Sequence, residues 1–568
     1  MTQMIALPSV LFLVFRRLRA PLIILIIAYA ISVLGFTLIP GEDDQGNPWR
    51  MDFFHAFYFV SFMGSTIGFG ELPYPFTGAQ RLWTLFTIYT TVISWLYAIG
   101  ALIALLRDRG LQQAISRIRT EAQVLRLKEP FYLVCGYGEA GRQVVALLSA
   151  VGKRTVVIES SEETLHRLEL EDISFTVPAL CADATIPQNL KLAGLTHPQC
   201  QGVIAVTGHE EENLKIAIAS KLLNRDLPLI CRTITDDTAD NMQSFGTNHI
   251  VNPFNIFAWH FGQAFNSPGQ YLLNDWLSKT EHQLADDPVF PPRGKWILCG
   301  FGKFGKVMCK HLLAQGNSVT VVVPNPDNAD APPGSINGRG TEAVTLTEAD
   351  VQSAVGIVAG TDHDANNLSI IVTARDLNSD LFCVARQNLH QNAELFKAAR
   401  LDMVANQNRM VASRIMSLLT TPLTTDFLYQ ANQQSPEWSN ELISRISGVI
   451  SERAPSTWVL RIGPQDAPAV IAASLDGSSI KIGDLLRQPN DRKTRLPGLV
   501  LMLRRNGIDT LTPDVTTVVR RGDHLLFCGD PEARRKMHRI VATQNIMNYI
   551  LSGTNKPVGT FWKWVSNQ

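Results

Sequence analysis

The sequence lacks several features that would place it in common protein classes. Its 51 Lys and Arg residues are balanced by 51 Asp and Glu residues, so no excess positive charge indicates bulk affinity for nucleic acid. No pair of cysteines has Cys-x-x-Cys spacing, so the sequence carries no zinc-binding motif of that type. None of the cysteines precedes residue 130, which fits reduced thiols in cytosolic domains. Arginines follow the apolar run 4–15 rather than precede it, which is unlike a signal peptide.

Two stretches lack charge altogether, residues 21–39 and 82–106, and each is long enough to cross a bilayer. Arginines precede the first stretch and follow the second, so both termini are expected on the cytoplasmic side of a cell (inner) membrane. Residues 4–15 are too few to span, and we expect an interfacial helix there. The alternative is that they extend the first span.

The stretch Ser65-Thr-Ile-Gly-Phe-Gly-Glu71 lies between the two apolar stretches, after an aromatic segment, 53–64, that is too short to span. It resembles the selectivity filter of potassium channels. A helix over 53–64 that is too short to span must re-enter the membrane beside a cavity, and the irregular backbone after it must line the same cavity. Each of the two features therefore supports the other. The alternative is a glycine turn between two hydrophobic helices. The resemblance assigns the K⁺ sites to the segment of Thr66, Ile67, Gly68, Phe69 and Gly70.

The sequence departs from the usual filter pattern, because Phe69 replaces Tyr and Glu71 stands where Asp is usual. Residues 82–99 contain no glycine, so the mid-helix hinge of related channels is absent. We expect bending at Thr90-Thr91, Ser94 or Gly100 instead. Residues 107–129 are expected to form a polar, largely helical linker that ends before Pro130.

The chain after the linker contains a repeat, because residues 132–142 and 296–306 are near copies that run from an apolar strand into Gly-x-Gly-x-x-Gly. Both copies are followed by alternating strand and helix patterns, which predicts two α/β domains with parallel sheets. Glycines in this context let backbone N–H groups approach phosphates at a helix N-terminus. Glu159 ends the next strand, where a carboxylate accepts bonds from ribose hydroxyls and repels a 2′-phosphate. The first copy therefore predicts a site for NAD or ADP/ATP, and the alternative is a vacant domain used for assembly. Its candidate residues are Gly136, Tyr137, Gly138, Glu139, Ala140, Gly141, Arg142, Glu159, Asp183, Ala184, Thr185, Thr207 and Gly208.

The second copy is a weaker candidate, because its second strand runs into Pro324-Asn325 without an acid. Gly300, Gly302, Lys303 and Gly305 are its candidate anion-binding residues. Asp362-His363-Asp364 has metal-binding side chains, but a polar loop is the better interpretation, and no metal site other than the K⁺ filter is assigned.

One pore module followed by two such repeats resembles the prokaryotic ligand-gated potassium channels with tandem RCK (regulator of K⁺ conductance) domains. The resemblance implies an all-α membrane pore, two Rossmann-like α/β RCK domains and a small α+β lobe, assembled as a homotetramer in a lipid bilayer. Residues 254–265 resemble the RCK crossover helix, which swaps across a dimer interface. Ca²⁺ is left open as a ligand, with no residues assigned. The expected boundaries are 1–108 for the pore, 109–129 for the linker, 130–290 and 291–436 for the RCK domains, 437–545 for the lobe and 546–568 for a tail.

These features favour a potassium channel gated by a cytosolic nucleotide. The alternatives are a regulatory membrane sensor of the potassium-transporter type and a membrane-anchored NAD-dependent oxidoreductase. The chain shows no separate substrate domain and no evident acid–base group, so we do not expect an enzyme. In the lobe, residues 458–461, 469–472 and 498–503 are expected to be strands.

Overall fold

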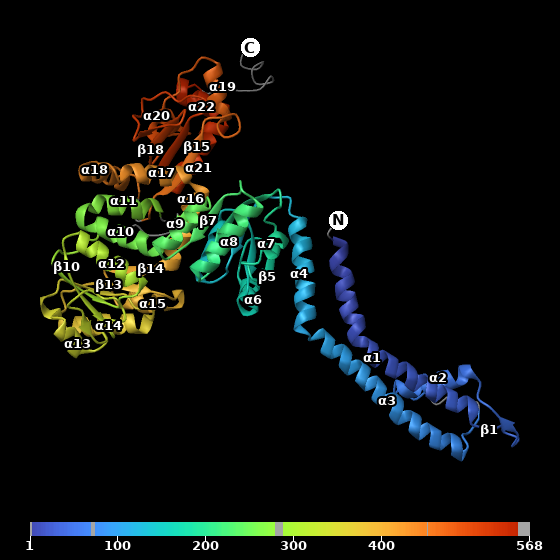
Figure 1. Ribbon diagram of the computed structural model, residues 1–568. Helices are drawn as coiled ribbons and strands as arrows, with labels where there is room; N and C mark the ends of the chain where they lie inside the picture. The colour runs from blue at the N-terminus through green and yellow to red at the C-terminus, as the bar shows by residue number, and fades with distance from the viewer. Residues whose placement is uncertain (1–2, 70–73, 279–287, 451–452, 555–568) are drawn as a thin grey trace, which may run out of the picture. The chain divides into compact units, whose positions relative to one another are not determined.

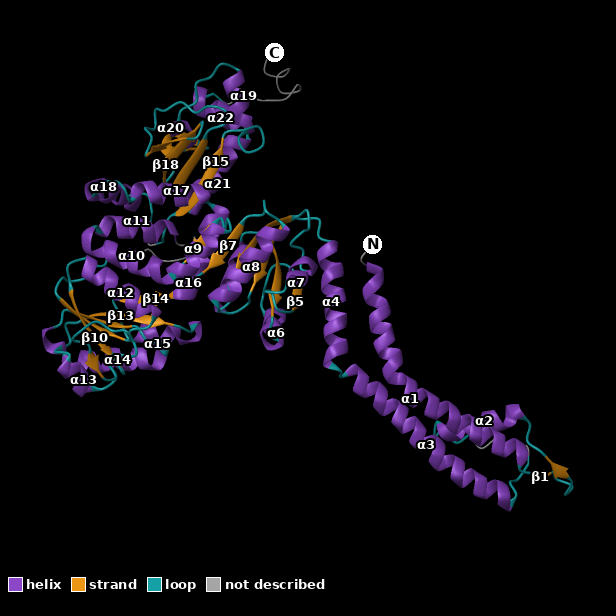
Figure 2. Cartoon of the chain, viewed as in Figure 1, coloured by secondary structure: helices purple, strands orange, loops and turns teal. Residues whose placement is uncertain are grey.

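The computed structural model describes residues 3–69, 74–278, 288–450 and 453–554. Helices α1 (Gln3–Leu38), α2 (Phe53–Gly64) and α3 (Gly78–Leu106) make up most of the N-terminal part, with a small hairpin of β1 (Gly41–Glu42) and β2 (Pro48–Trp49) (Figure 1). The rest of the chain alternates strands and helices (Figure 2).

Two helices of the N-terminal part are long and apolar enough to cross a membrane, over Val14–Leu38 and Gly78–Leu106. The expectation of a separate interfacial helix over residues 4–15 is wrong, because α1 continues unbroken from Gln3 to Leu38. Pro21 leaves one backbone carbonyl of this helix without its usual donor but does not end it. Residues 4–15 therefore extend the first helix, whose candidate membrane span is Val14–Leu38.

The packing of α1 on α3 depends on a glycine and on two tryptophans. A Cβ on Gly35 would lie 2.0 Å from the Trp83 ring, so only glycine fits there. Trp83 Nε1 donates to the Ser32 carbonyl at 3.1 Å, and Trp95 Nε1 donates to the Tyr29 hydroxyl at 2.8 Å. These bonds give the tryptophan N–H groups partners inside the apolar pair of helices.

The expected bending points of α3 differ in their surroundings. Thr90, Thr91 and Ser94 each donate their hydroxyl to the carbonyl four residues earlier, which is an arrangement that often bends helices. A Cβ on Gly100 would meet nothing within 4 Å. The position of the bend stays a prediction.

The linker forms α4 (Arg109–Leu125), a helix with Asp108 as its N-cap. The Asp108 carboxylate accepts from Leu111 N at 3.0 Å and also pairs with Arg17 of α1. The pKa of Asp108 lies below its usual value, because the Leu111 N–H and the Arg17 guanidinium stabilise the charged form.

The first α/β domain has the strand order β5-β4-β3-β6-β7-β8, in which β3, β4, β6, β7 and β8 pair in parallel. This is the doubly wound order, in which a crevice opens at the carboxyl ends of the central strands. Its strands are β3 (Phe131–Cys135), β4 (Arg154–Glu159), β5 (Ala179–Cys181), β6 (Cys200–Ala205), β7 (Leu229–Arg232) and β8 (His249–Val251). Its helices are α5 (Glu139–Ala150), α6 (Glu162–Leu170), α7 (Pro187–Leu192), α8 (Glu210–Leu223), α9 (Asp236–Ser244), α10 (Pro253–Asn266) and α11 (Pro268–Ser278).

The second α/β domain repeats this topology, with the order β11-β10-β9-β12-β13-β14 and parallel pairing throughout. Its strands are β9 (Lys295–Cys299), β10 (Ser318–Val323), β11 (Ile336–Asn337), β12 (Gly356–Ala359), β13 (Phe382–Gln387) and β14 (Met403–Asn406). Its helices are α12 (Lys303–Ala314), α13 (Ala343–Glu348), α14 (Asp364–Leu377), α15 (Ala393–Ala398), α16 (Gln407–Thr420) and α17 (Pro422–Ala431).

The two α/β domains exchange helices within the one chain. The predicted crossover helix is α10, which leaves the first domain and packs on α12 of the second. In return α16, from the second domain, packs on α5 of the first. Phe254 and Phe261 of α10 are buried in one core with Phe304 and Trp296 of the second domain. The two domains therefore share a core.

The C-terminal lobe is α+β, with an antiparallel sheet in the order β15-β20-β18-β19. The strand expected at 469–472 is wrong, because Pro468 stands at the first position of helix α19 (Pro468–Leu475). Helix α22 (Gln544–Ser552) crosses the boundary expected at residue 546 and buries Met547 and Ile550 in the core of the lobe. The other elements are α18 (Pro436–Ser447), β15 (Ser456–Arg461), α20 (Ile482–Leu485), β16 (Arg487–Gln488), β17 (Asp491–Arg495), β18 (Gly498–Arg505), β19 (Ile508–Leu511), β20 (His524–Gly529) and α21 (Pro531–Ala542).

Candidate functional site

The filter-like stretch follows α2, and its backbone alternates between left-handed and other conformations. Thr66 has φ +61° and Gly68 has φ +66°, with Ile67 between them outside this left-handed region. Successive peptide groups in such an alternation turn the same way, so their carbonyls can face one axis. The N–H groups of Ile67 and Gly68 both donate to the Phe62 carbonyl, at 3.0 and 3.3 Å, which ties the stretch to the short helix.

The side chains of this stretch are uncovered within one chain. Ile67 is 65% exposed and Phe69 is 72% exposed, so no other described part of the chain covers them. A Cβ on Gly68 would meet nothing within 4 Å. Gly70, the last residue of the expected filter, lies outside the described residues.

The first glycine-rich loop has three glycines with three different surroundings. Gly136 has φ +96° and lies against Thr207, so it combines a left-handed backbone with a close approach. A Cβ on Gly141 would lie 2.0 Å from the Gly136 carbonyl oxygen, inside the loop itself. Gly138 is the N-cap of α5 and has open space where a Cβ would project. The fold therefore requires glycine at positions 136 and 141, and it does not require glycine at position 138.

Glu159 is the last residue of β4 and lies at the edge of the crevice. One of its carboxylate oxygens accepts from Tyr137 N at 2.7 Å and the other accepts from Ser161 N at 2.9 Å. The carboxylate therefore lies directly beside the glycine-rich loop, as expected for a residue that binds ribose hydroxyls.

Tyr137 and Arg142 are held by a residue that the sequence analysis missed, Glu171. The Tyr137 hydroxyl donates to Glu171 at 2.8 Å, and Arg142 Nε pairs with the same carboxylate at 2.5 Å. Burial and the bond to Glu171 both raise the pKa of Tyr137. Arg142, expected to bind cofactor, is thus already paired with an acid.

The remaining candidates of the first domain lie at the ends of β5 and β6 and at the start of α5. Asp183 accepts from the backbone N–H of Thr185 at 2.8 Å and from its hydroxyl at 2.7 Å, while Ala184 is buried. Thr207 N donates to Asn213 at 2.9 Å, and Asn213 also donates to the Arg232 carbonyl at 3.0 Å. Asn213 is a second residue that the sequence analysis missed. Glu139 and Ala140 open α5, and Gly208 has open space around it.

The second glycine-rich loop has the same backbone but different partners. Gly300 has φ +95°, a Cβ on Gly305 would lie 2.1 Å from the Gly300 carbonyl oxygen, and Gly302 is open. Lys303 Nζ pairs with Glu210 of α8 at 2.7 Å. β10 ends at Val323 without an acid. The cation of this loop is therefore neutralised by a carboxylate of the first α/β domain.

Glu210 has several hydrogen-bond donors. One of its oxygens accepts from Ile234 N at 2.9 Å and from Thr235 N at 2.8 Å. Burial raises the pKa of Glu210, but Lys303 and these N–H groups outweigh it and hold the pKa at about 2.

Two known protein families match this chain, one in its N-terminal part and one in its α/β domains. The "TrkA-N domain" family matches residues 132–253 and 296–407, and the "Ion channel" family matches residues 22–108. The chain joins an ion-channel domain to two TrkA-N domains. The ion-channel domain and the two apolar helices make it a membrane protein.

Several relatives are potassium-transport proteins. Potassium channel protein 1 of Methanocaldococcus jannaschii is 26% identical over 36% of this chain and 59% of its own length. The voltage-gated potassium channel Kch of Escherichia coli is 21% identical over 41% of this chain and 53% of its own. The chain thus matches little more than half the length of these two relatives. Among solved structures, the GsuK channel bound to NAD is 14% identical with a TM-score of 0.44, over 94% of this chain and 100% of its own.

The Asp362-His363-Asp364 stretch of the second TrkA-N domain leads into α14, with His363 as the N-cap and Asp364 as the first helical residue. Asp362 pairs with Arg386, and Asp364 accepts from Asn388 N at 2.7 Å and Leu389 N at 3.0 Å. Across the part of the chain that the structure describes, no group of three His, Cys, Asp or Glu side chains could hold a metal ion. The carboxylates of Asp362 and Asp364 are thus bonded to the protein itself.

Proposed function

We propose that this protein is a potassium-selective channel whose opening depends on an adenine nucleotide, NAD or ADP/ATP, bound to its first TrkA-N domain. The observation that carries the proposal is the alternating backbone at Thr66 and Gly68, directly after a helix of only 12 residues. Four copies of this stretch would surround one axis with rings of carbonyl oxygens, which replace the hydration shell of K⁺. The protein is then a homotetramer of the cell (inner) membrane with both termini in the cytoplasm.

The relatives support the ion that we propose. The proteins from M. jannaschii and E. coli are named as potassium channels, and a further relative, 25% identical over 84% of its own length, is a Trk system potassium uptake protein TrkA homolog from Methanothermobacter thermautotrophicus. The last match covers 32% of this chain. Potassium transport is thus common to the names of these three relatives.

The proposed nucleotide site rests on Gly138 and Glu159. The open space at Gly138 lies at the N-terminus of α5, where backbone N–H groups and the helix dipole favour a phosphate. Glu159 is the ribose-binding group, and its charge disfavours NADP. The nucleotide changes channel opening only to the extent that it binds the open and closed states with different affinity.

The experiment is K⁺ flux through the purified full-length protein in liposomes, compared with Na⁺ flux, with and without NAD, ADP or ATP. We expect K⁺ to exceed Na⁺ and at least one nucleotide to change the rate. Glu159→Ala should remove the nucleotide response and leave the basal flux, while Glu162→Ala, an exposed acid at the start of α6, should change neither. Equal K⁺ and Na⁺ rates would contradict the channel proposal, and a nucleotide response retained in Glu159→Ala would contradict the site.

A further inference from the structure

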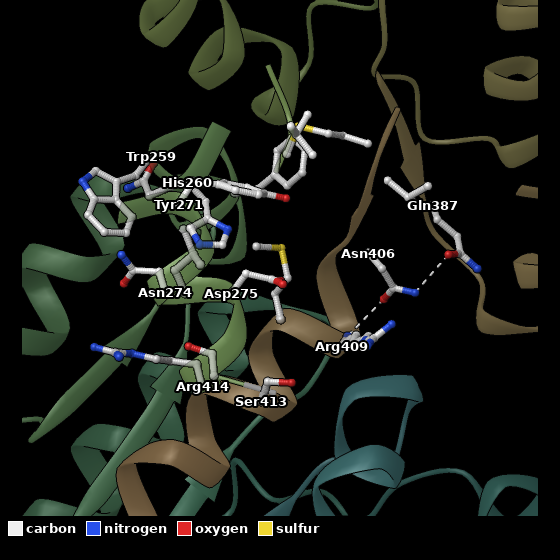
Figure 3. A pocket seen from close by; sticks show the side chains of 18 of the residues that line it. Trp259, His260, Tyr271, Asn274, Asp275, Gln387, Asn406, Arg409, Ser413 and Arg414 are labelled. Atoms are coloured by element: carbon white, nitrogen blue, oxygen red, sulfur yellow. Dashed lines mark hydrogen bonds between the residues drawn. The ribbon is translucent and has the colours of Figure 1, made fainter. Parts of the chain in front are cut away.

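A cavity of about 1210 Å³ lies between the two TrkA-N domains. Its walls come from α10 and α11 of the first domain and from β14, α15 and α16 of the second (Figure 3). No residue of the proposed filter or of either glycine-rich loop lines it. Its volume exceeds the range of about 300 to 1,000 Å³ that is common for small-molecule sites.

One wall carries a row of aromatic rings. His260 lies between Trp259 and Tyr271, with ring centroids 6.2 and 4.8 Å away, and Figure 3 shows the three side chains together on this side of the cavity. Trp259 is 41% exposed, so part of its ring has no protein cover. Aromatic side chains of this kind form the apolar contact surface of many ligand sites.

The cavity also contains a half-buried cation, Arg414, for which the described residues supply no counter-ion. Arg414 of α16 is half-buried, and among the described residues it has no acidic side chain within ion-pair distance. Burial lowers the pKa of Arg414, which reflects the cost of removing its charge from water. A guanidinium in such a place gains from an anion that enters beside it.

Basic side chains outnumber acidic ones by one in the described lining of the cavity. The described lining has four basic side chains, Lys310, Lys397, Arg409 and Arg414, and three acidic ones, Asp236, Asp275 and Asp402. Asp236 accepts from Asn255 at 2.8 Å and Asp402 accepts from Cys383 N at 2.7 Å, and these neutral donors orient the two carboxylates without removing their charge.

We propose that this cavity binds a small organic anion with a planar aromatic ring. Arg414 pairs with its carboxylate, sulfonate or phosphate group, and the ring lies against Trp259 and Tyr271. Arg409 lies at the N-terminal end of the same helix and adds positive charge to the wall.

Helix α16 connects this cavity to the first glycine-rich loop. The same helix lines the cavity and packs on α5, which starts at that loop. A coupling through α16 would be reciprocal, because each ligand would change the affinity of the other by the same factor. This coupling rests on the proposed nucleotide site, whereas binding of the anion does not.

The test uses 5-sulfosalicylate, a water-soluble aromatic anion, with the purified full-length protein and no nucleotide. Isothermal titration calorimetry should show saturable binding that Arg414→Gln weakens by at least about tenfold, because a charged hydrogen-bond donor is lost. Lys215→Gln removes the same charge from an exposed position on α8 and should leave the affinity unchanged. Benzyl alcohol, a neutral ring, should show no dependence on Arg414.

A second variant separates loss of the site from loss of the fold. Ser413→Phe fills space beside Arg414 without changing charge and should also abolish binding of the probe. Because Arg414 has no ion pair to lose, Arg414→Gln should unfold at the wild-type temperature or above it. Absence of saturable binding to the wild type, or equal affinity in the wild type and both variants, would overturn the proposal.

Discussion

Gly138 and Gly141 belong to the same loop, but the structure requires only one of them. An alanine at 138 has open space, whereas an alanine at 141 would meet the Gly136 carbonyl oxygen at 2.0 Å. We predict that Gly138→Ala keeps the free energy of unfolding within about 0.5 kcal/mol of the wild type. The same change should weaken NAD or ADP binding at least about tenfold, because the backbone can no longer approach the phosphates. Gly141→Ala should instead destabilise the fold by more than about 2 kcal/mol.

Thermal unfolding and nucleotide titration of both variants measure these two effects. Unchanged nucleotide affinity in Gly138→Ala would mean that the open space does not receive a phosphate.

Glu210 gives a pH dependence with a definite sign. Its pKa is about 2 in the folded protein, against 4.5 for an unperturbed glutamate, so its contribution to stability is complete above about pH 4.5 and is lost as the pH falls toward 2. We predict that Glu210→Gln lowers the free energy of unfolding by about 1 to 3 kcal/mol at pH 7. The difference from the wild type should shrink between pH 4.5 and pH 2.

Glu211→Gln is the matched control, because Glu211 is exposed in the same helical turn. Denaturant unfolding at pH 7 and pH 3 measures both variants, and a Glu210→Gln difference that is the same at the two pH values would contradict the assignment.

At the scale of elements, we predict that the exchange of α10 and α16 makes the two TrkA-N domains unfold as one unit. Phe261 of α10 is 1% exposed and packs on Trp296 of the second domain, with ring centroids 5.5 Å apart. Phe261→Ala should therefore destabilise both domains together by about 3 to 5 kcal/mol. Phe245→Ala, at a 45% exposed position, should cost less than about 1 kcal/mol.

Denaturant unfolding followed at two probes, one in each domain, measures this coupling. Two separate transitions, with Phe261→Ala shifting only one of them, would show that the domains fold independently.

The sequence predicts the elements whose signals are local. The glycine motifs indicate β3 with α5 and β9 with α12, and the aromatic segment 53–64 matches α2. The lobe shows where local signals are ambiguous, because residues 469–472 are short, apolar and β-branched enough for either a strand or a helix. Pro468 at the first position of α19 distinguishes the two.

Other features depend on residues far apart in the chain and have no local signal. The pairs Lys303 with Glu210 and Arg142 with Glu171 join different elements, so no spacing predicts them. The resemblance to RCK domains implies a swapped crossover helix, but not that the partner is the second domain of the same chain. The left-handed conformation of Thr66 is also unexpected, since glycine is the residue that adopts it without strain.

At the scale of the whole molecule, the short helix α2 leaves apolar side chains without cover in one chain. Phe53, Phe54 and Phe57 are 70%, 71% and 47% exposed, and the backbone after α2 is not helical. Such backbone is tolerated at membrane depth only where protein or a water-filled cavity covers it, so we expect other copies of the chain to surround it. We predict that native mass spectrometry gives a complex of four 62.8 kDa chains.

Gly68→Ala tests whether this assembly conducts through the filter-like stretch. Gly68 has φ +66° and open space, so alanine meets no neighbour in its own chain but costs about 1 to 2 kcal/mol in the left-handed conformation. The tetramer should persist while K⁺-selective flux into liposomes is lost. Gly78→Ala, at an equally open position at the start of α3, should keep both assembly and flux. A monomeric or dimeric mass would contradict the assembly, and normal flux in Gly68→Ala would mean that K⁺ crosses by another path.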